Sequence, residues 1–401
     1  MTSERIDLVI VGAGIIGLAT ARQYLSQCPG KSVIVLERED DSALHQTGRN
    51  SGVLHSGIYY APGSMKAELA VAGRSAMVKF CEEREIDHEI CGKVIVATRN
   101  DEIERLRALR ERADHNGLAA ELISTARLKE IEPHCMGLEA LHIPSTGIVS
   151  YAEVCRAMVD EIEDKGGVIR YGAKVLTIDE SNEGARVSTL KGEIVAGLVV
   201  NCAGLRSDHV AKMVGAADGH RIVPFRGEYF ELVPERCDLF RGLIYPVPDP
   251  SFPFLGVHLT RMIDGSVHAG PNAVLAMARE GYRWRDIELS QIVEHIGNRG
   301  LWKLARKYWR TGAGEIWRSV SKDAFVKALQ RLVPDIVAKD LEASPAGVRA
   351  QAMDGKGELL DDFSITEAAN TLHVLNAPSP AATASLEIAA EIVRMIDTRS
   401  S

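Results

Sequence analysis

The chain begins with two short apolar runs separated by a glycine-rich turn. The first run covers residues 6–11 and is followed by Gly12, Gly14 and Gly17, after which apolar positions recur with helical spacing to about residue 27. A second apolar run, at 32–36, ends in Glu37. This order predicts a strand, a tight turn, a helix and a second strand, which is the beginning of a Rossmann-like α/β domain.

The pattern changes after residue 223 and returns near the end of the chain. Prolines interrupt short apolar runs beyond 223, a helical region covers 286–332, and a strand, a loop and a helix follow at 372–396. Such segregation predicts a discontinuous domain with a second, mixed α+β domain inserted into it. We expect the nucleotide-binding domain to comprise residues 1–90, 145–222 and 340–401. The inserted substrate domain should then comprise 91–144 and 223–339.

Composition narrows the class of protein. With 401 residues, 46% hydrophobic and 25% charged, the chain has the composition of a globular protein with two domains. A formal net charge of −8 argues against a nucleic-acid partner. The seven cysteines form no CxxC pair, so we predict no metal site and reduced thiols. No apolar stretch near the start is long enough to span a membrane, so we expect a cytoplasmic protein.

The three glycines and Glu37 have the spacing of a dinucleotide site. The first glycine permits the tight turn, the second lets a pyrophosphate approach the backbone, and the third lets helix and strand pack closely. The helix N-terminus attracts the phosphate charge, and a carboxylate at Glu37 would accept hydrogen bonds from ribose hydroxyls. The motif alone does not distinguish NAD from FAD.

Two further segments favour FAD. Ala203 and Gly204 end an apolar strand in a small-residue turn, and the loop 376–382 opens the last helix. Ser379, Pro380, Ala381 and Ala382 lie where that helix begins, and backbone amides at its N-terminus could meet the electron-rich end of a flavin. The alternative is that both segments are ordinary strand-to-helix turns.

The loop from His45 to Tyr60 carries a resemblance to a known family. Its sequence, HQTGRNSGVLHSGIYY, resembles the FAD-dependent D-amino-acid-oxidase-like superfamily and, within it, the L-2-hydroxyglutarate dehydrogenase/oxidase family. The same resemblance extends over the segments 222–229, 244–249, 252–258, 270–275 and 346–351. It implies a Rossmann-like FAD domain with an inserted substrate domain. It also implies oxidation of L-2-hydroxyglutarate to 2-oxoglutarate, with electrons passed to a quinone or to oxygen.

Together with the resemblance, the motifs give a set of expected FAD-binding residues. These are Gly12, Gly14, Ile16, Gly17, Glu37, Arg38, Thr47, Gly48, Asn50, Ser51, Gly52, Val175, Ala203, Gly204, Arg349, Ser379, Pro380, Ala381 and Ala382.

Oxidation of a 2-hydroxy acid needs a proton acceptor, and our candidate is His55. It follows the second strand in a loop expected near the flavin, and an imidazole suits the task. The alternative is a structural histidine bonded to the backbone, and covalent attachment of FAD at His55 is a further option that the resemblance raises.

The two carboxylates of such a substrate need positively charged or donor groups. The candidates are Arg226, Arg349, His258 and Tyr245, with Tyr60 and Asn272 as neutral donors. The alternative for each arginine is an internal ion pair. Arg349 could also serve the flavin.

A stretch at 299–310 combines basic and aromatic residues. All four tryptophans fall between 284 and 317, and helical spacing of 299–310 puts Arg299, Lys303, Arg306, Lys307 and Arg310 on one side. The other side would carry Leu301, Trp302, Leu304, Ala305, Tyr308 and Trp309. This pattern is typical of an interfacial helix that brings the enzyme to membrane quinone. The alternative is a helix packed on the core with a solvated basic face.

Two other functions remain open at this stage. One is a FAD-dependent oxidase of a small amino acid or amine from the same superfamily. The other is an NAD-binding regulatory protein without redox chemistry.

Overall fold

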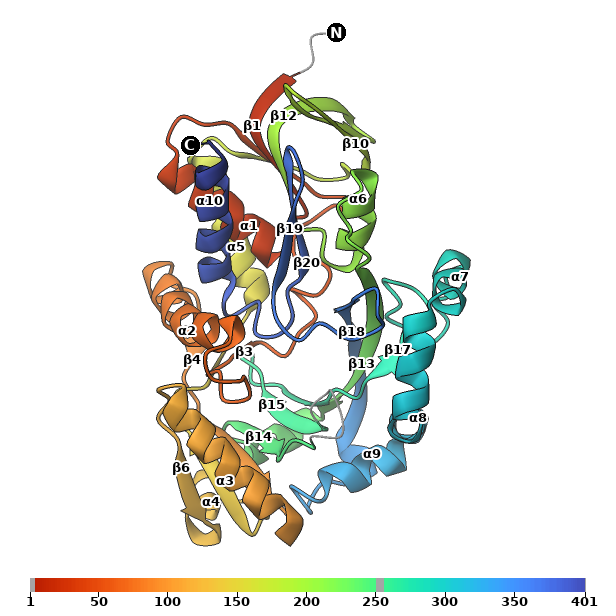
Figure 1. Cartoon of the computed structure of the whole chain (residues 1–401). Helices are drawn as coiled ribbons and strands as arrows, with labels where there is room; N and C mark the ends of the chain where they lie inside the picture. Colours follow the sequence, from red (N-terminus) through yellow and green to blue (C-terminus); the bar gives the residue numbers. More distant parts are fainter. Residues whose placement is uncertain (1–3, 250–255, 401) are drawn as a thin grey trace.

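The computed structural model describes residues 4–249 and 256–400, so the 252–255 part of the family resemblance lies outside the described residues. Two large sheets lie end to end along the molecule, one near the chain termini and one at the far end (Figure 1). A small sheet of β3 (Val53–Leu54), β8 (Gly147–Val149) and β4 (His88–Glu89) joins them.

The first sheet has a parallel centre. Its strands are β1 (Glu4–Val11), β2 (Val33–Leu36), β9 (Val168–Arg170), β10 (Val175–Ser181), β11 (Gly184–Thr189), β12 (Gly192–Asn201), β19 (Ser364–Glu367) and β20 (Thr371–Asn376). Strand β1 pairs in parallel with β2 and β12, and β12 pairs in parallel with β20. Strands β10 and β11 form an antiparallel extension of β12.

Helices cover both faces of this sheet, as a parallel sheet requires. Helices α1 (Ile15–Gln27), α5 (Tyr151–Asp164) and α10 (Ser385–Ser400) pack together on one face, and α6 (Ser207–Met213) lies on the other. Successive side chains of β1 point to opposite faces of the sheet, so this strand packs against both layers of helices. Leu8 and Ile10 point into the core under α1, whereas Val9 points into the core that includes Val210 of α6.

The second sheet is mostly antiparallel and curves beneath the first. Its strands follow the order β17 (Val274–Leu275), β13 (Arg221–Leu232), β16 (Val267–Gly270), β15 (His258–Arg261), β14 (Leu243–Pro246), β5 (Lys93–Ala97), β7 (Glu139–Ile143) and β6 (Glu121–Ser124), with β18 (Leu341–Met353) paired to β13. Its helices are α3 (Asn100–His115), α4 (Thr125–Ile131), α7 (Leu289–Ile296), α8 (Arg299–Val320) and α9 (Lys322–Leu329). Three short 3-10 helices complete this half and its connections: Gly204–Arg206, Pro234–Leu239 and Ala338–Asp340.

Helix α2 (Met65–Glu83) connects the two halves and packs against α10. Its glycine at position 73 allows the contact, because a Cβ there would lie 2.5 Å from the Cα of Ala384. The loop that precedes α10 is therefore held against a helix from the middle of the molecule.

Sheet membership differs from the expected domain division most clearly at β18. The division assigned residues 340–401 to the nucleotide-binding domain, but β18 belongs to the second sheet, where it pairs with β13 from Leu341 opposite Leu232 to Met353 opposite Arg221. Pairing over their whole length satisfies the backbone hydrogen-bonding groups of both strands, so β18 stays in the second sheet beyond the expected domain boundary. The rest of the division stays a prediction.

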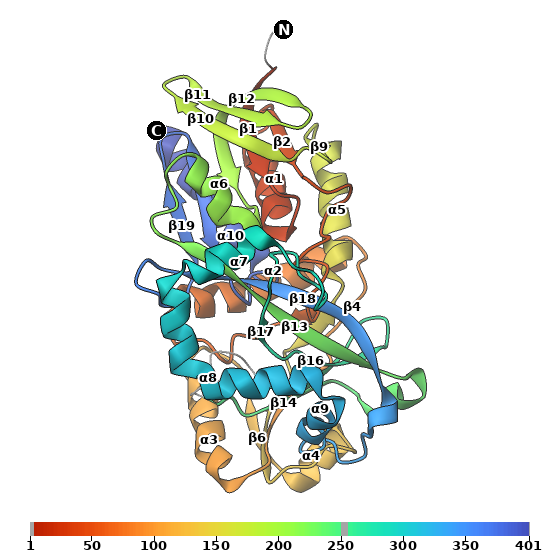
Figure 2. The same cartoon turned by 90° about the vertical axis from the view of Figure 1, so that its right-hand side faces the viewer.

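The amphipathic helix expected at 299–310 is part of a longer helix, which bends and whose apolar residues do not share one face. Helix α8 has non-helical backbone angles at Tyr308, where it bends (Figure 2). Leu301 is buried against the core, whereas the side chains of Trp302 and Trp309 are 60% and 62% exposed. The apolar residues therefore do not form one face, because the core takes Leu301 and leaves the tryptophans outside. The side chain of Arg310 lies outside the described residues.

Candidate active site

A cavity of about 990 Å³ lies between the two sheets and takes residues from both. Its walls include the turn after β1, the end of β2, the loop 43–55, the turn after β12, strand β18 and the loop 377–382. This volume is at the upper end of the range of roughly 300–1,000 Å³ for small-molecule sites. Five of the residues expected at the reacting end line it together: His55, Tyr60, Tyr245, His258 and Arg349.

At one end of the cavity, the turn after β1 fits a phosphate. Gly12 has a φ of +108°, and a Cβ there would lie 2.6 Å from the carbonyl oxygen of Cys202. At Gly17 a Cβ would lie 2.0 Å from the carbonyl oxygen of Gly12. Helix α1 has no acidic residue in its first turn, and its positive end faces the cavity.

Glu37 lies at the end of β2, where it lines the cavity and also orders the surrounding backbone. One carboxylate oxygen accepts a hydrogen bond from Ala13 N at 2.8 Å, and the other accepts one from Glu39 N at 3.0 Å. A carboxylate fixed in this way retains lone pairs for two neighbouring hydroxyl groups of a ribose.

Most of the expected FAD-binding residues line this cavity, but three do not: Gly17, Gly48 and Gly52. These glycines serve close packing instead. A Cβ at position 48 would lie 2.4 Å from the carbonyl oxygen of Ala43, and one at position 52 would lie 2.8 Å from that of Val149. Their contribution to the cofactor site is to let the loop fold tightly behind it.

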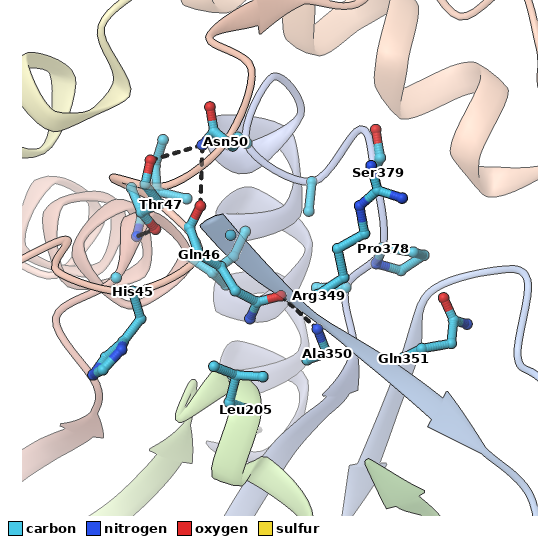
Figure 3. Close-up of a pocket in the computed structure, with 18 of the residues that line it drawn as sticks. His45, Gln46, Thr47, Asn50, Leu205, Arg349, Ala350, Gln351, Pro378 and Ser379 are labelled. Atoms are coloured by element: carbon cyan, nitrogen blue, oxygen red, sulfur yellow. Dashed lines mark hydrogen bonds between the residues drawn. The ribbon is translucent and has the colours of Figure 1, made fainter. Parts of the chain in front are cut away.

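The loop 45–52 is joined to β18 across the cavity (Figure 3). Asn50 Nδ2 donates to the carbonyl oxygens of Gln46 and Thr47, and the Oε1 of Gln46 accepts a hydrogen bond from Ala350 N at 2.8 Å. The side chain of Arg349 extends from β18 towards Ser379 in the loop before α10 (Figure 3).

His55 faces the cavity and its backbone is held by the loop before α10. Its N–H donates to the Oγ1 of Thr383 at 3.1 Å, and its Nε2 lies 3.4 Å from the Oγ of Ser379. Burial lowers the pKa of His55 to about 3, and the positive charges of Lys93 and Arg349 act in the same direction. The imidazole is therefore neutral near pH 7 and able to accept a proton.

A second neutral imidazole lies on the sheet floor. His258 Nδ1 donates to the carbonyl oxygen of Gly256 at 2.8 Å, which leaves Nε2 as an acceptor, and burial lowers the pKa of His258 to about 3. Its ring stacks on that of Tyr245, with centroids 4.0 Å apart. Tyr60 lies near the loop before α10, with its hydroxyl 3.5 Å from Ser379 Oγ.

Two expected substrate residues, Arg226 and Asn272, do not line the cavity. Side chains alternate along β13, and because Gly227 and Tyr229 line the cavity, Arg226 points to the opposite side. Its guanidinium lies 4.2 Å from the ring centroid of Trp284 and 3.3 Å from the carboxylate of Glu228. Asn272 accepts a hydrogen bond from Glu228 N at 2.9 Å.

The sequence patterns missed three residues beside the reacting end: Tyr59, Tyr229 and Lys93. Tyr59 and Tyr229 line the cavity, and Tyr229 shares a hydrogen bond with the side chain of Arg349. Lys93 is buried against Tyr59 and Tyr245. The sequence could have indicated Lys93 only by its place as the one charged residue in the apolar run Lys93–Ala97.

The residues present fit FAD. The cavity extends from the Gly12 turn and Glu37 to the loop before α10, and different parts of FAD would lie against these segments. The glycine turn and the start of α1 suit the pyrophosphate, Glu37 suits the ribose, and the small residues at 377–382 leave room for a planar ring.

Comparisons with known proteins agree with this geometry. The family model described as FAD dependent oxidoreductase matches residues 7–395. The chain is 49% identical over 384 residues to the L-2-hydroxyglutarate dehydrogenase of Indibacter alkaliphilus, an alignment that covers 95% of this chain and 96% of the relative. It is 46% identical to that of Escherichia coli K12 (98% and 93% covered) and 44% identical to the human mitochondrial enzyme (99% and 90% covered).

Solved structures show the same fold. The L-α-glycerophosphate oxidase of Mycoplasma pneumoniae, solved with FAD bound, superposes with a TM-score of 0.81 at 22% identity, covering 98% of this chain and 95% of its own. Glycine oxidase of Geobacillus kaustophilus superposes with a TM-score of 0.75 at 18% identity, covering 99% and 95%. The expected fold, a Rossmann-like FAD domain with an inserted α+β domain, is therefore confirmed. The chain belongs to the FAD-dependent oxidoreductase family and, within it, to the L-2-hydroxyglutarate dehydrogenase family.

Proposed function

We propose that this chain oxidises L-2-hydroxyglutarate to 2-oxoglutarate with FAD as its cofactor. The observation that carries the proposal is the neutral His55 imidazole at the flavin end of a cavity that also holds the Arg349 cation. The high identity to L-2-hydroxyglutarate dehydrogenases over nearly the whole chain supports the substrate. The alternative of an amino-acid or amine oxidase has support only from structures that share the fold at low identity.

In the proposed reaction His55 is the base. Its neutral imidazole accepts the proton of the substrate 2-hydroxyl group while hydride leaves C2, the carbon that carries this hydroxyl. The C–O single bond thereby becomes a carbonyl. When bound, FAD supplies the two-electron acceptor for that hydride. The Oγ1 of Thr383 accepts a hydrogen bond from His55 N and donates one to the carbonyl oxygen of Val53, which fixes the backbone that carries the imidazole.

Arg349 is the proposed partner of the substrate carboxylate next to the reacting carbon. It lies on β18 beside the loop before α10 (Figure 3). A hydrogen bond with Tyr229 helps to position its side chain. A guanidinium can hold a carboxylate through two parallel hydrogen bonds, which fixes the orientation of the 2-carbon as well as the charge.

Anaerobic reduction of the flavin tests this function. The purified protein should be yellow and should lose its flavin absorbance when L-2-hydroxyglutarate is added without oxygen. The D-enantiomer, glycine and L-proline should leave the spectrum unchanged. Bleaching by an amino acid, but not by the L-hydroxy acid, would reject the proposal in favour of an amino-acid oxidase.

We further propose that the electrons pass to a membrane quinone, with contact made through a surface on residues 284–317. Among the described residues no helix is sufficiently long and apolar to cross a bilayer. This surface nevertheless exposes a series of large apolar side chains: Trp284, Ile287, Leu289, Val293, Ile296, Trp302, Trp309, Ile316 and Trp317. Four basic residues of α8 are also exposed: Arg299, Lys303, Arg306 and Lys307.

Exposed tryptophans next to basic side chains favour the interface of an anionic bilayer. Helices α7 and α8 lie together along one side of the molecule, which would bring them to a membrane at the same time (Figure 2). The double variant Trp302→Ser/Trp309→Ser should bind vesicles containing anionic lipid less tightly than the unaltered protein, and its anaerobic flavin reduction should not change. Equal vesicle binding by both proteins would refute membrane contact through these tryptophans.

A further inference from the structure

A buried lysine that the proposed reaction does not use lies beside the cavity. Lys93 begins β5 and is only 1% exposed, and its Nζ has no hydrogen-bond partner among the described residues. A buried ammonium without a partner is costly, so its presence needs a compensating interaction. If this side chain only filled space in the core, methionine or leucine would pack there equally well.

The ammonium of Lys93 lies behind one wall of the cavity. Nζ is 4.5 Å from the ring centroid of Tyr59 and 5.1 Å from that of Tyr245, and both tyrosines line the cavity. The hydroxyl of Tyr59 is also buried without a hydrogen-bond partner among those residues. Because protein and not water surrounds this charge, its field reaches the cavity with little screening.

Three neighbouring strands connect Lys93 to the reacting end, with Lys93 opposite Leu243 and therefore diagonal to Tyr245. Strands β5, β14 and β15 are adjacent, and they carry Lys93, Tyr245 and His258 in that order. Burial lowers the pKa of His258 most, and the positive charges of Arg349 on β18 and of Lys93 lower it further. Two cations therefore act on the same imidazole from different strands of the sheet.

Several of the cations that do line the cavity are already engaged, which limits their use for a second carboxylate. Lys66 is paired with Asp361, and Arg105 is paired with Asp101. Arg226, the second arginine that the sequence suggested, points away from the cavity. Burial lowers the pKa of Lys93 to about 7, so a nearby carboxylate would draw a proton to it.

We propose that Lys93 is the residue that selects substrates with a second carboxylate. The inference rests on the proposed function, because it assigns the far carboxylate of the same substrate. Arg349 holds the carboxylate next to the reacting carbon, and Lys93, with the Tyr59 hydroxyl, attracts the distal one.

The test compares two substrates in the FAD-loaded enzyme. L-2-Hydroxyvalerate has the same carbon chain as L-2-hydroxyglutarate, with a methyl group in place of the distal carboxylate. In Lys93→Met the second-order rate constant of flavin reduction by L-2-hydroxyglutarate should fall by roughly 10- to 100-fold, as expected when a poorly screened buried charge that attracts the distal carboxylate is removed. The same constant for L-2-hydroxyvalerate should change by less than about threefold, which is the scale of indirect effects. Lys79→Met, which removes an exposed lysine of α2, serves as the matched control.

Each outcome has a distinct meaning. Equal losses with both substrates, or no loss with either, would overturn the role of Lys93. Failure of the unaltered enzyme to be reduced by L-2-hydroxyglutarate would instead reject the proposed function before any variant is made.

Ligand binding to the unaltered holoenzyme gives a second test, which does not depend on how a variant folds. The dissociation constant of 2-oxoglutarate should rise roughly tenfold between pH 6.5 and 8.5 as Lys93 loses its proton, whereas that of 2-oxovalerate should stay constant. The ionisable groups around Lys93 do not change charge in this range, because their pKa values are raised (Tyr59, Tyr245) or lowered (His55, His258), or the group is always charged (Arg349). Parallel pH dependence for the two ligands would overturn the proposal.

Discussion

Lowering the pH from 7.0 to 5.5 should not slow flavin reduction if His55 is the base. Burial lowers the pKa of His55 to about 3. With an ordinary imidazole pKa of about 6.5, the neutral fraction would fall from about 0.76 to about 0.09, which is an eightfold loss of base. With a pKa of about 3, the imidazole is almost fully neutral at both pH values. The substrate carboxylates, with pKa values near 4 or below, also stay ionised at pH 5.5.

The quantity to measure is the second-order rate constant of flavin reduction at low L-2-hydroxyglutarate, because it reports the ionisation of the free enzyme. We expect it to stay constant or to rise up to about twofold, since Lys93, with a pKa of about 7, gains charge as the pH falls. His55→Ala should retain FAD and react roughly 10²- to 10⁴-fold more slowly at every pH, which is the usual contribution of a general base. An eightfold decline with a midpoint near pH 6.5 would refute the reasoning, because it would require an imidazole with an ordinary pKa.

Three further predictions follow from the fold and the cofactor site. Gly12→Ala should be purified with a much lower ratio of flavin to protein absorbance, because its φ of +108° and the 2.6 Å approach to Cys202 exclude a Cβ; full flavin content would contradict this reading. Arg279→Met should lower the free energy of unfolding in urea by about 3–5 kcal/mol, because it leaves the fully buried carboxylate of Asp208 without its 2.6 Å partner; a loss under about 1 kcal/mol would show that the pair is dispensable. Stability should also fall in acid because of His373. This residue is fully buried with its pKa lowered to about 4, so only the unfolded chain takes up its proton as the pH falls below about 6.5. This residue alone should remove about 2 kcal/mol between pH 7.5 and 5.0, and His373→Gln should show a correspondingly weaker pH dependence in urea titrations.

Local patterns were sufficient for the nucleotide end of the site. Gly12, Gly17 and Glu37 act within one βαβ unit, so their spacing along the chain fixes their spacing in space. The loop before α10 could be recognised for a similar reason, because its small residues and the helix that they open are adjacent in the chain. The glycines that support the loop 45–52 were identified, but their role is in packing and not in contact.

The reacting end depends on strand pairing that no local pattern encodes. Arg226 looked suited to a carboxylate because it lies between apolar residues, but the direction of its side chain depends on which face of β13 meets the cavity. Lys93 is separated from Tyr245 by about 150 residues of chain, and the parallel pairing of β5 with β14 brings them together. The division of α8 into a buried Leu301 and exposed tryptophans likewise depends on where the core lies.

The long strand β18 has a consequence for how substrate enters. It is paired along its length with β13 in the second sheet, yet its amide at position 350 donates to Gln46 and its amide at 352 donates to Asn376, both in the cofactor half. At position 347 there is no room for a Cβ, which would lie 2.3 Å from the carbonyl oxygen of Arg49. A strand fastened to both halves opposes a hinge movement of one half against the other. Access to the flavin is therefore expected through side-chain and loop movement at the cavity mouth, with the two halves moving as one body.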